Sequence, residues 1–246
     1  MSHERTLDRL PTRINPEKEK LLHVGGIVIG GSKGTGKTTF LNILESRYGL
    51  APADIGSKVR DTFEKKTGTA FRDARKRDLG DDLAVDMVQW ELFKNADPTK
   101  PFSCHSWLAP FFLKTLKDEG LVPAPVPAIL LYTDPPEIGI NRAAERDAKK
   151  LGISIKQAVE ENDRRFAKDW EQWTSLYPPL EGLDLYRPGA KDHDRNKFYD
   201  LEINTAAHPL EENIEILHRW LVKQGFVEPK RNNTNSGLIV SLNPRG

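Results

Sequence analysis

The sequence predicts an α/β fold built on a parallel sheet, and two features of the chain lead to this prediction. Short apolar runs, of the length of buried strands, alternate with longer segments whose apolar residues recur at helical spacing. At residues 25–41, and again at residues 128–137, such a run passes directly into a predicted helix. Because parallel strands need helical crossovers between them, this alternation favours a sheet with helices on its faces.

The first of these passages, GGIVIGGSKGTGKTTFL, carries a phosphate-loop motif. Residues 27–29 are predicted to form a buried strand and residues 39–48 a helix. The residues between them match the pattern GxxxxGK[ST] through Gly31, Gly36, Lys37 and Thr38. A chance match in a chain of this length is expected on the order of once in a hundred, given an average glycine usage of about 7%. The motif therefore favours phosphate binding.

Each part of this loop suits a polyphosphate. Glycines let successive N–H groups turn toward phosphate oxygens, and the start of the helix adds the positive end of its dipole. Lys37 is placed to reach the outer phosphates and Thr38 to bind Mg²⁺. We therefore predict a bound polyphosphate with Mg²⁺, Thr38 as metal ligand, and a cofactor-binding set of Gly31, Ser32, Lys33, Gly34, Thr35, Gly36, Lys37, Thr38 and Thr39.

The second passage joins a predicted strand at residues 128–132 to a helix. Asp134 is expected to be the N-cap of this helix, with Pro135 at its first position and Glu137 completing a capping box. The sequence therefore predicts a helix that starts directly behind the strand, as a parallel sheet requires.

Two further helices are predicted downstream. Ser154 and Gln157 form a capping box that opens a long charged helix running to about Leu176. The last helix follows Pro209, carries apolar residues on one face and is expected to stop near Gly225. The polar ranges 1–22 and 226–246 are interpreted as tails around one domain at residues 23–225.

Composition limits the classes of partner. The chain of 246 residues has 37 Lys and Arg against 36 Asp and Glu, so no nucleic acid or anionic membrane is expected as a partner. Cys104 is the only cysteine, which excludes an internal disulfide or a cysteine metal cluster. No apolar run reaches the length of a membrane span, and residues 1–20 lack the apolar core of a signal peptide. A cytoplasmic location is therefore expected.

Other motifs decide among the classes of phosphate-loop protein. No Asp stands three residues before a Gly, as the switch motif of GTPases requires, and NKFYD at residues 196–200 has one residue too many for the guanine-reading NKxD. Neither the LSGGQ signature of transport ATPases nor a strand ending in paired acids occurs. A small-molecule kinase needs mainly positive charge around the transferred group and a shield against water, so this class is favoured.

That positive charge lies on the helices predicted after residue 134. Arg142 and Arg146 are four residues apart and share a helix face, while Arg164 and Arg165 lie on the next helix. Two charged helices joined by a short glycine turn can close over a phosphate site as a lid. The alternative is a solvated surface paired with neighbouring acids, which is commoner for such helices in isolation. The phosphate loop upstream favours the lid.

Four motifs, taken in order, resemble one known family. They are GGSKGTGKTT, DPPEIGINRAAERDAKKLGIS, QAVEENDRRFAKDWEQWTSLYP and FYDLEINTAAHPLEE. The second is similar to the AP-x-E-x(4)-R-x-x-E-R-x(5)-G stretch of the cytidylate kinases, and the last to their YDLVINT segment. Over residues 24–222 the chain thus resembles the cytidylate kinases, more narrowly the short archaeal-type and cytidylate-kinase-like members.

The resemblance implies the fold of a nucleoside monophosphate kinase. This is a P-loop NTPase fold with a parallel five-stranded sheet, an acceptor-binding insert at about residues 56–100 and a helical lid at about residues 142–196. Carried over to this sequence, Lys37, Arg142 and Arg165 would be catalytic. The substrate-binding residues would be Arg60, Asp86, Trp107 and Arg146. For Arg60, an ordinary place on a helix surface is an equal alternative.

One stretch departs from the family. Where the family has E-G-R-L-A-G, this chain has CHSWLAPFF, with Trp107 in the place of the acceptor-gripping arginine and no carboxylate beside it. Trp107 is alternatively a core residue, as most tryptophans flanked by Leu, Pro and Phe are. Because the arginine would grip the acceptor phosphate, its replacement by Trp107 is expected to affect which acceptor the protein binds.

The sequence therefore predicts an ATP- and Mg²⁺-dependent kinase whose substrates are nucleotides. CMP or dCMP is the expected acceptor. Two alternatives stay open: a P-loop kinase of another small-molecule acceptor, and a non-catalytic nucleotide-binding regulatory protein. The sequence does not indicate a protein partner or an oligomeric state.

Overall fold

The computed structural model describes residues 19, 21–53, 79–183 and 198–228. Of the predicted features, Arg60, residues 56–78 of the acceptor insert, residues 184–196 of the lid and most of both tails lie outside the described residues.

Five strands form one sheet, and all their pairings are parallel. In chain order they are β1 Gly26–Gly30, β2 Ala51–Pro52, β3 Phe102–His105, β4 Ala128–Tyr132 and β5 Leu201–Asn204. Their order across the sheet is β2-β3-β1-β4-β5. This confirms the predicted α/β fold with a five-stranded parallel sheet. Because the chain leaves the central β1 for one side and later returns to the other, the carboxyl ends of β1, β3 and β4 form the switch point where such sheets bind ligands.

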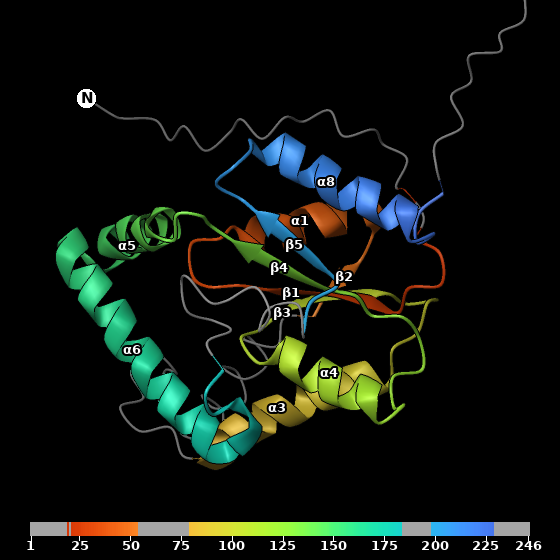
Figure 1. Ribbon diagram of the computed structural model, residues 1–246, viewed down its shortest axis with the longest axis horizontal. Helices are drawn as coiled ribbons and strands as arrows, with labels where there is room; N and C mark the ends of the chain where they lie inside the picture. The colour runs from red at the N-terminus through yellow and green to blue at the C-terminus, as the bar shows by residue number, and fades with distance from the viewer. Residues whose placement is uncertain (1–18, 20, 54–78, 184–197, 229–246) are drawn as a thin grey trace, which may run out of the picture.

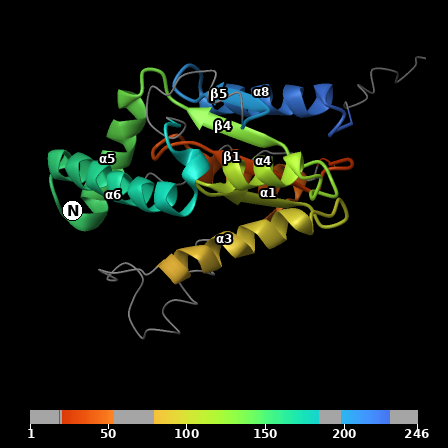
Figure 2. The same ribbon diagram turned by 60° about the horizontal axis from the view of Figure 1, so that its bottom comes forward.

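Helices cover both faces of the sheet (Figure 1). On one face lie α1 and α8, and on the other α3 and α4, while α5 and α6 form a hairpin beyond the arrowheads of β4 and β5. Figure 2 shows the same hairpin projecting from the carboxyl side of the sheet. The helices are α1 Lys37–Tyr48, α3 Leu79–Lys94, α4 Ala109–Asp118, α5 Glu137–Leu151, α6 Ile155–Leu176 and α8 Leu210–Lys223, with a 3₁₀ turn η2 at Pro178–Leu180.

The central strand distributes its side chains between two separate cores. Successive residues of a strand point to opposite faces. Ile27 and Ile29 accordingly pack with α1 and α8, whereas Val28 packs with the aromatic residues of α3 and α4. All three are fully buried. A third, small cluster of Ala144, Ala148 and Ala158 lies inside the α5–α6 hairpin.

The predicted start of the helix after β4 is wrong. The structure begins α5 at Glu137 with Pro136 as N-cap, and no side chain caps it, so Asp134, Pro135 and Glu137 do not have the predicted capping roles. Pro135 is followed by another proline, and a residue before proline is disfavoured in the helical region, so the helix cannot start there. The hydroxyl of Thr133 instead accepts the N–H of Gly139 at 3.2 Å.

The other predicted helix boundaries agree more closely with the structure. The capping box of α6 is present, because Gln157 N–H donates to Ser154 Oγ at 3.2 Å and Ser154 N–H donates to Gln157 Oε1 at 3.0 Å. Helix α6 ends at Leu176 as expected. Helix α1, however, begins at Lys37 and not at residue 39, so the end of the phosphate-loop motif is already helical.

Short pieces of both predicted tails pack on the domain. Leu21 and Val227 form an antiparallel bridge and are 7% and 2% exposed. Leu22 N–H donates to Phe226 O at 2.9 Å. Both residues of the bridge belong to the core under α1 and α8. Among the residues that the structure describes, no helix has the length and apolar character to cross a bilayer.

Candidate active site

The loop between β1 and α1 has the backbone of a tight cradle. Gly31, Gly34 and Gly36 have φ of 134°, 80° and 89°, a region that other residues rarely adopt. A Cβ at Gly31 would collide with the carbonyl oxygen of Leu131 on β4, and one at Gly34 with that of Gly139 on α5. Gly31 and Gly34 are thus required both by backbone conformation and by close neighbours, and Gly36 by its backbone conformation alone. Inside the loop, the hydroxyl of Thr35 donates to Ser32 O at 2.9 Å.

Lys37 turns back over this cradle. Its Nζ donates to Gly31 O at 2.8 Å and to Ser32 O at 2.6 Å. Burial, and after it the nearby cations Arg146 and Lys33, together lower the pKa of Lys37 to about 7. Several positive charges therefore converge on one loop, an arrangement that a bound anion would stabilise.

Lys33 extends from the loop to the hairpin. Its Nζ donates to Asn162 Oδ1 on α6 at 2.6 Å. Burial and then Arg165 lower the pKa of Lys33, while Asp147 and Asp169 raise it. The loop, α5 and α6 thus meet in one mixed cluster of charges.

The arginines of α5 and α6 differ in where their charge acts. Arg146 Nε lies 2.9 Å from Asp147 Oδ1, and its charge acts on both loop lysines. Arg165 Nε lies 3.7 Å from Asp169 Oδ2, and the charge of Arg165 lowers the pKa of Lys33. Arg164 pairs with Glu161 on the exposed surface of α6, as the solvated-surface alternative expects.

Arg142 is exposed on α5, and within the described ranges the structure records no hydrogen bond or ion pair for it. It is also not among the charges that act on Lys37 or Lys33. Of the two arginines on this helix face, the contacts therefore single out Arg146.

Trp107 lies where β3 passes into α4, next to the loop. The Nζ of Lys37 is 5.7 Å from the centre of its ring. The ring also packs against Phe166 and Trp173 on α6, with ring centres 5.1 Å and 5.9 Å away. Trp107 is only half-buried, so it is neither a deep core residue nor an open surface residue. It therefore lies between Lys37 of the phosphate loop and the aromatic residues of α6.

Asp86 has contacts with the end of the lid helix. It lies on α3, is 6% exposed, and its Oδ2 accepts the hydroxyl of Tyr177 at 2.6 Å. Its Oδ1 accepts from Gln89 Nε2 at 3.3 Å. The contact with Tyr177 joins α3 to the end of α6. A role of Asp86 in binding ribose or base stays a prediction.

A magnesium ion would depend on few protein groups. Thr38 is exposed in the first turn of α1, and its role as a metal ligand stays a prediction. The described residues contain no group of three or more His, Cys, Asp or Glu side chains able to hold a metal. The hydroxyl of Thr38 would therefore have to act together with phosphate oxygens and water, as Mg²⁺ commonly allows.

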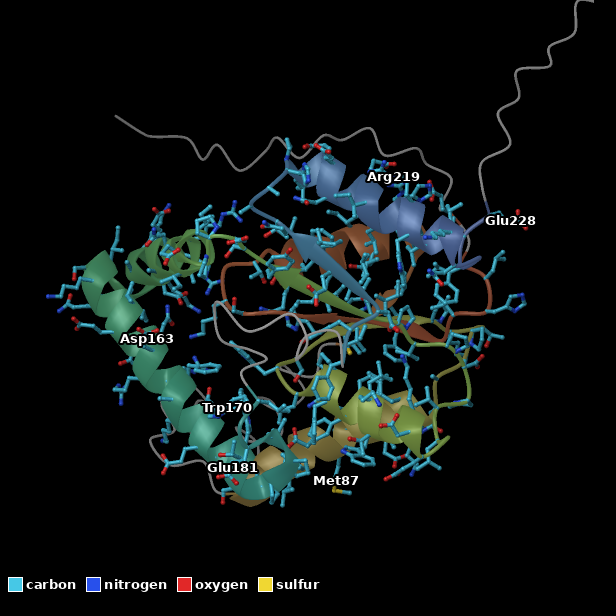
Figure 3. The ribbon with its side chains drawn as sticks, viewed as in Figure 1. Met87, Asp163, Trp170, Glu181, Arg219 and Glu228 are labelled. Carbon is cyan, nitrogen blue, oxygen red and sulfur yellow. The ribbon has the colours of Figure 1, made fainter. Side chains whose placement is uncertain are left out.

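Two parts of the site had no place in the sequence prediction. One is the contact of Lys33 with Asn162, which no sequence pattern predicts. The other is the packing of the lid on Trp107, for which a signal exists: Phe166, Trp170, Trp173 and Tyr177 recur at helical spacing along α6. Figure 3 places Trp170 on the part of α6 that approaches α3, and Asp163 nearer the tip of the hairpin.

Comparison with known proteins bears on the class of enzyme. No family model matches the chain. It is 26% identical over 199 residues to a cytidylate kinase of Ignicoccus hospitalis, which covers 80% of this chain and 98% of the relative. It is 25% identical over 163 residues to a cytidylate kinase of Methanococcus vannielii, covering 65% and 86%. A solved shikimate kinase of Acinetobacter baumannii, in complex with shikimate, is 18% identical with a TM-score of 0.45, covering 81% of this chain and 94% of that one.

The relatives confirm the predicted resemblance to cytidylate kinases. They also confirm the predicted class of enzyme, a P-loop kinase, which the sheet order and the phosphate loop of this chain independently fit.

Proposed function

We propose that this P-loop kinase transfers a phosphoryl group from ATP to a nucleoside monophosphate, with CMP or dCMP as the preferred acceptor. The observation that carries the proposal is the convergence of Lys37, Lys33 and Arg146 at the carboxyl end of the central strand, under a helical hairpin. The acceptor is suggested by the two relatives named cytidylate kinase.

The residues of the loop fit the phosphates of ATP. The positive charges of Lys33 and Arg146 around Lys37 are the feature that a phosphate would offset, and the glycines leave backbone N–H groups able to turn inward. Lys37 would hold the outer phosphates and Thr38 would bind Mg²⁺. When bound, Mg²⁺ would neutralise charge on the phosphate oxygens.

The remaining side chains would orient the reactants and exclude water. On binding a nucleotide, Lys37 would exchange its contacts with Gly31 O and Ser32 O for phosphate oxygens. Arg146 and Arg165 would face the transferred group and stabilise its charge. Trp107 and Phe166 would close the site on the side of the lid, which favours transfer to the acceptor over hydrolysis.

The proposal is tested by measuring ADP release in a coupled assay, with ATP, Mg²⁺ and a panel of nucleoside monophosphates. We expect CMP or dCMP to give the highest kcat/KM and chelation of Mg²⁺ to stop the reaction. A thermal-shift screen of the same panel gives an independent measure of binding. If the protein binds ATP but no monophosphate accelerates ADP release, the proposed acceptor class is wrong.

A second class of acceptor is favoured by one observation. The position predicted for the acceptor-gripping arginine holds Trp107, whose ring contacts Lys37 and the lid. A tryptophan offers stacking and one N–H, whereas an arginine offers a bidentate grip on a phosphate. Another hydroxylated or phosphorylated small molecule is therefore the alternative acceptor. The assay panel should include such compounds.

The variant Trp107→Arg tests the assignment of this position. If Trp107 occupies the acceptor-phosphate site, the new guanidinium should tighten CMP binding by roughly tenfold, the gain expected from one charge-assisted hydrogen bond. Isothermal calorimetry measures the affinity, and Trp107→Phe, which keeps an aromatic ring, is the matched control. Unchanged affinity in a folded Trp107→Arg variant would place the acceptor phosphate elsewhere.

The lowered pKa of Lys37 predicts a pH dependence of nucleotide binding. Above a pH of about 7 the free protein holds Lys37 neutral, whereas bound phosphates favour its charged form, so binding takes up a proton. ATP affinity should therefore fall as the pH rises above this value, by up to about tenfold per pH unit. Calorimetry at about pH 8, in buffers with different ionisation enthalpies, counts the protons taken up. An uptake of zero would mean that Lys37 is already charged in the free protein.

A further inference from the structure

We propose that Lys33 is a positioning residue: through Asn162 it holds the α5–α6 hairpin over the phosphate loop, and this sets Arg146 close to Lys37 and Arg165 close to Lys33. The contact between Lys33 and Asn162 is called the clasp below. The effect on catalysis rests on the proposed function, whereas the clasp itself does not.

The clasp is a charge-assisted hydrogen bond between distant parts of the chain. Lys33 Nζ lies 2.6 Å from Asn162 Oδ1, across a separation of 129 residues. The contact is partly buried, and hydrogen bonds to charged groups are stronger than those between neutral groups. Because Lys33 stands inside the phosphate-loop motif, the clasp joins the loop directly to the lid.

Asn162 extends the clasp to both helices of the hairpin. It lies on α6, and its side chain also helps to hold the pKa of Asp147 on α5 below its usual value. Although burial raises the pKa of Asp147, the hydrogen bonds from Arg146 and Asn162 hold it below its usual value. The charged Asp147 thus connects Asn162 with the arginine whose charge acts on Lys37. A displacement of Asn162 would be transmitted to Arg146 through this one carboxylate.

The base of the hairpin is held separately, by backbone. A Cβ at Gly34 of the loop would collide with the carbonyl of Gly139 in the first turn of α5, so the two backbones are in close contact there. The second half of α6 is held by the packing of Phe166 and Trp173 on Trp107. The clasp lies between these two attachments. It is therefore suited to set the distance between the middle of the hairpin and the loop.

The charges around Lys33 explain why a lysine suits this place. Arg165 and Arg146 repel it, whereas Asp147 and Asp169 attract it. The long side chain of Lys33 places its ammonium group near Asp147 and Asp169. These two acids also pair with Arg146 and Arg165. Without Lys33, the acids of the hairpin would lose one counter-charge and the hairpin would lose its polar contact with the loop.

A competing role for Lys33 is to bind the phosphates directly. The two roles make different demands on Asn162. A lysine that binds phosphate does not need Asn162, whereas a lysine that positions the lid acts only through it. Variants of both residues therefore distinguish them.

The test compares Lys33→Met, Asn162→Ala and the double variant in the full chain, with Lys33→Arg as the conservative variant. The control for loss of surface charge is Lys168→Met, which replaces an exposed lysine on α6, the helix of Asn162. Hydrogen exchange of residues 155–168, measured without nucleotide, reports the clasp. We expect each single variant to exchange about tenfold faster, the double variant no faster than either, and Lys33→Arg to exchange like the wild type.

Kinetics give the second measurement. With the acceptor found in the ADP-release assay, Lys33→Met and Asn162→Ala should each lower kcat by about tenfold, with the KM for ATP little changed and the two losses non-additive. A raised KM for ATP in Lys33→Met alone would make Lys33 a phosphate ligand and overturn the proposal. So would wild-type exchange in Asn162→Ala. If no acceptor is found, the proposed function fails while hydrogen exchange still decides the clasp.

Discussion

Replacing Lys37 with alanine is expected to abolish phosphoryl transfer while leaving the fold intact. The ammonium group lies in the loop and, among the described residues, donates only to Gly31 O and Ser32 O, so its removal leaves the buried strands and helices in place. In the proposed reaction it faces the outer phosphates, and loss of such a group should lower kcat by at least about a thousandfold. The coupled assay measures kcat, and circular dichroism measures the unfolding temperature.

The matched control is Lys114→Ala on α4, whose lysine pairs with Asp118 at the surface. This variant removes the same charge far from the loop and should behave like the wild type, since exposed ion pairs contribute little. Burial and neighbouring cations disfavour the charged form of Lys37, so Lys37→Ala should be no less stable than the wild type. Near wild-type turnover in Lys37→Ala would contradict the assignment of the loop.

Arg146→Ala is expected to have the second-largest effect, and Arg142→Ala a much smaller one. Both arginines are exposed on α5 and four residues apart, so the two variants make the same change on the same helix. Only Arg146 acts on Lys37 and lies against Asp147. Its loss should cost about 2.7 to 4 kcal/mol of transition-state stabilisation, by analogy with the loss of an oxyanion donor.

The expected signature is a fall in kcat with little change in the KM for ATP. The pKa of Lys37 should also rise toward its ordinary value, because a repelling cation is removed. Proton uptake on ATP binding would then shrink, which calorimetry detects even where turnover is too slow to follow. A larger kcat loss in Arg142→Ala than in Arg146→Ala would restore Arg142 as the catalytic arginine.

The sequence predicted those parts of the fold that depend on local pattern. The apolar run at residues 27–29 and the glycines that follow it need no distant partner to be recognised. The same is true of the box formed by Ser154 and Gln157, where two side chains and two backbone N–H groups satisfy one another. In these places neighbouring residues determine the structure, so their spacing is sufficient for the prediction.

Other features depend on competition or on long-range contact. Asp134 satisfies the composition of a helix cap, but the proline pair behind it moves the helix start to Glu137. Strand β2 is only two residues long, and its pairing with β3 defines it more than any sequence pattern does. Arg142 and Arg146 have equivalent spacing, so only the packing of the hairpin distinguishes them. The contact of Lys33 with Asn162 joins residues that sequence patterns treat independently.

The bridge between Leu21 and Val227 brings the entry and exit of the folded unit together at one point of its surface. That point lies at the α1 and α8 side, away from the α5–α6 hairpin (Figure 1). Domains whose ends lie close together can be spliced into a loop of a host protein without stretching either chain. Residues 21–227 could therefore be inserted as a unit into a surface loop of another protein. The two connections to that protein would lie away from the α5–α6 hairpin and the phosphate loop.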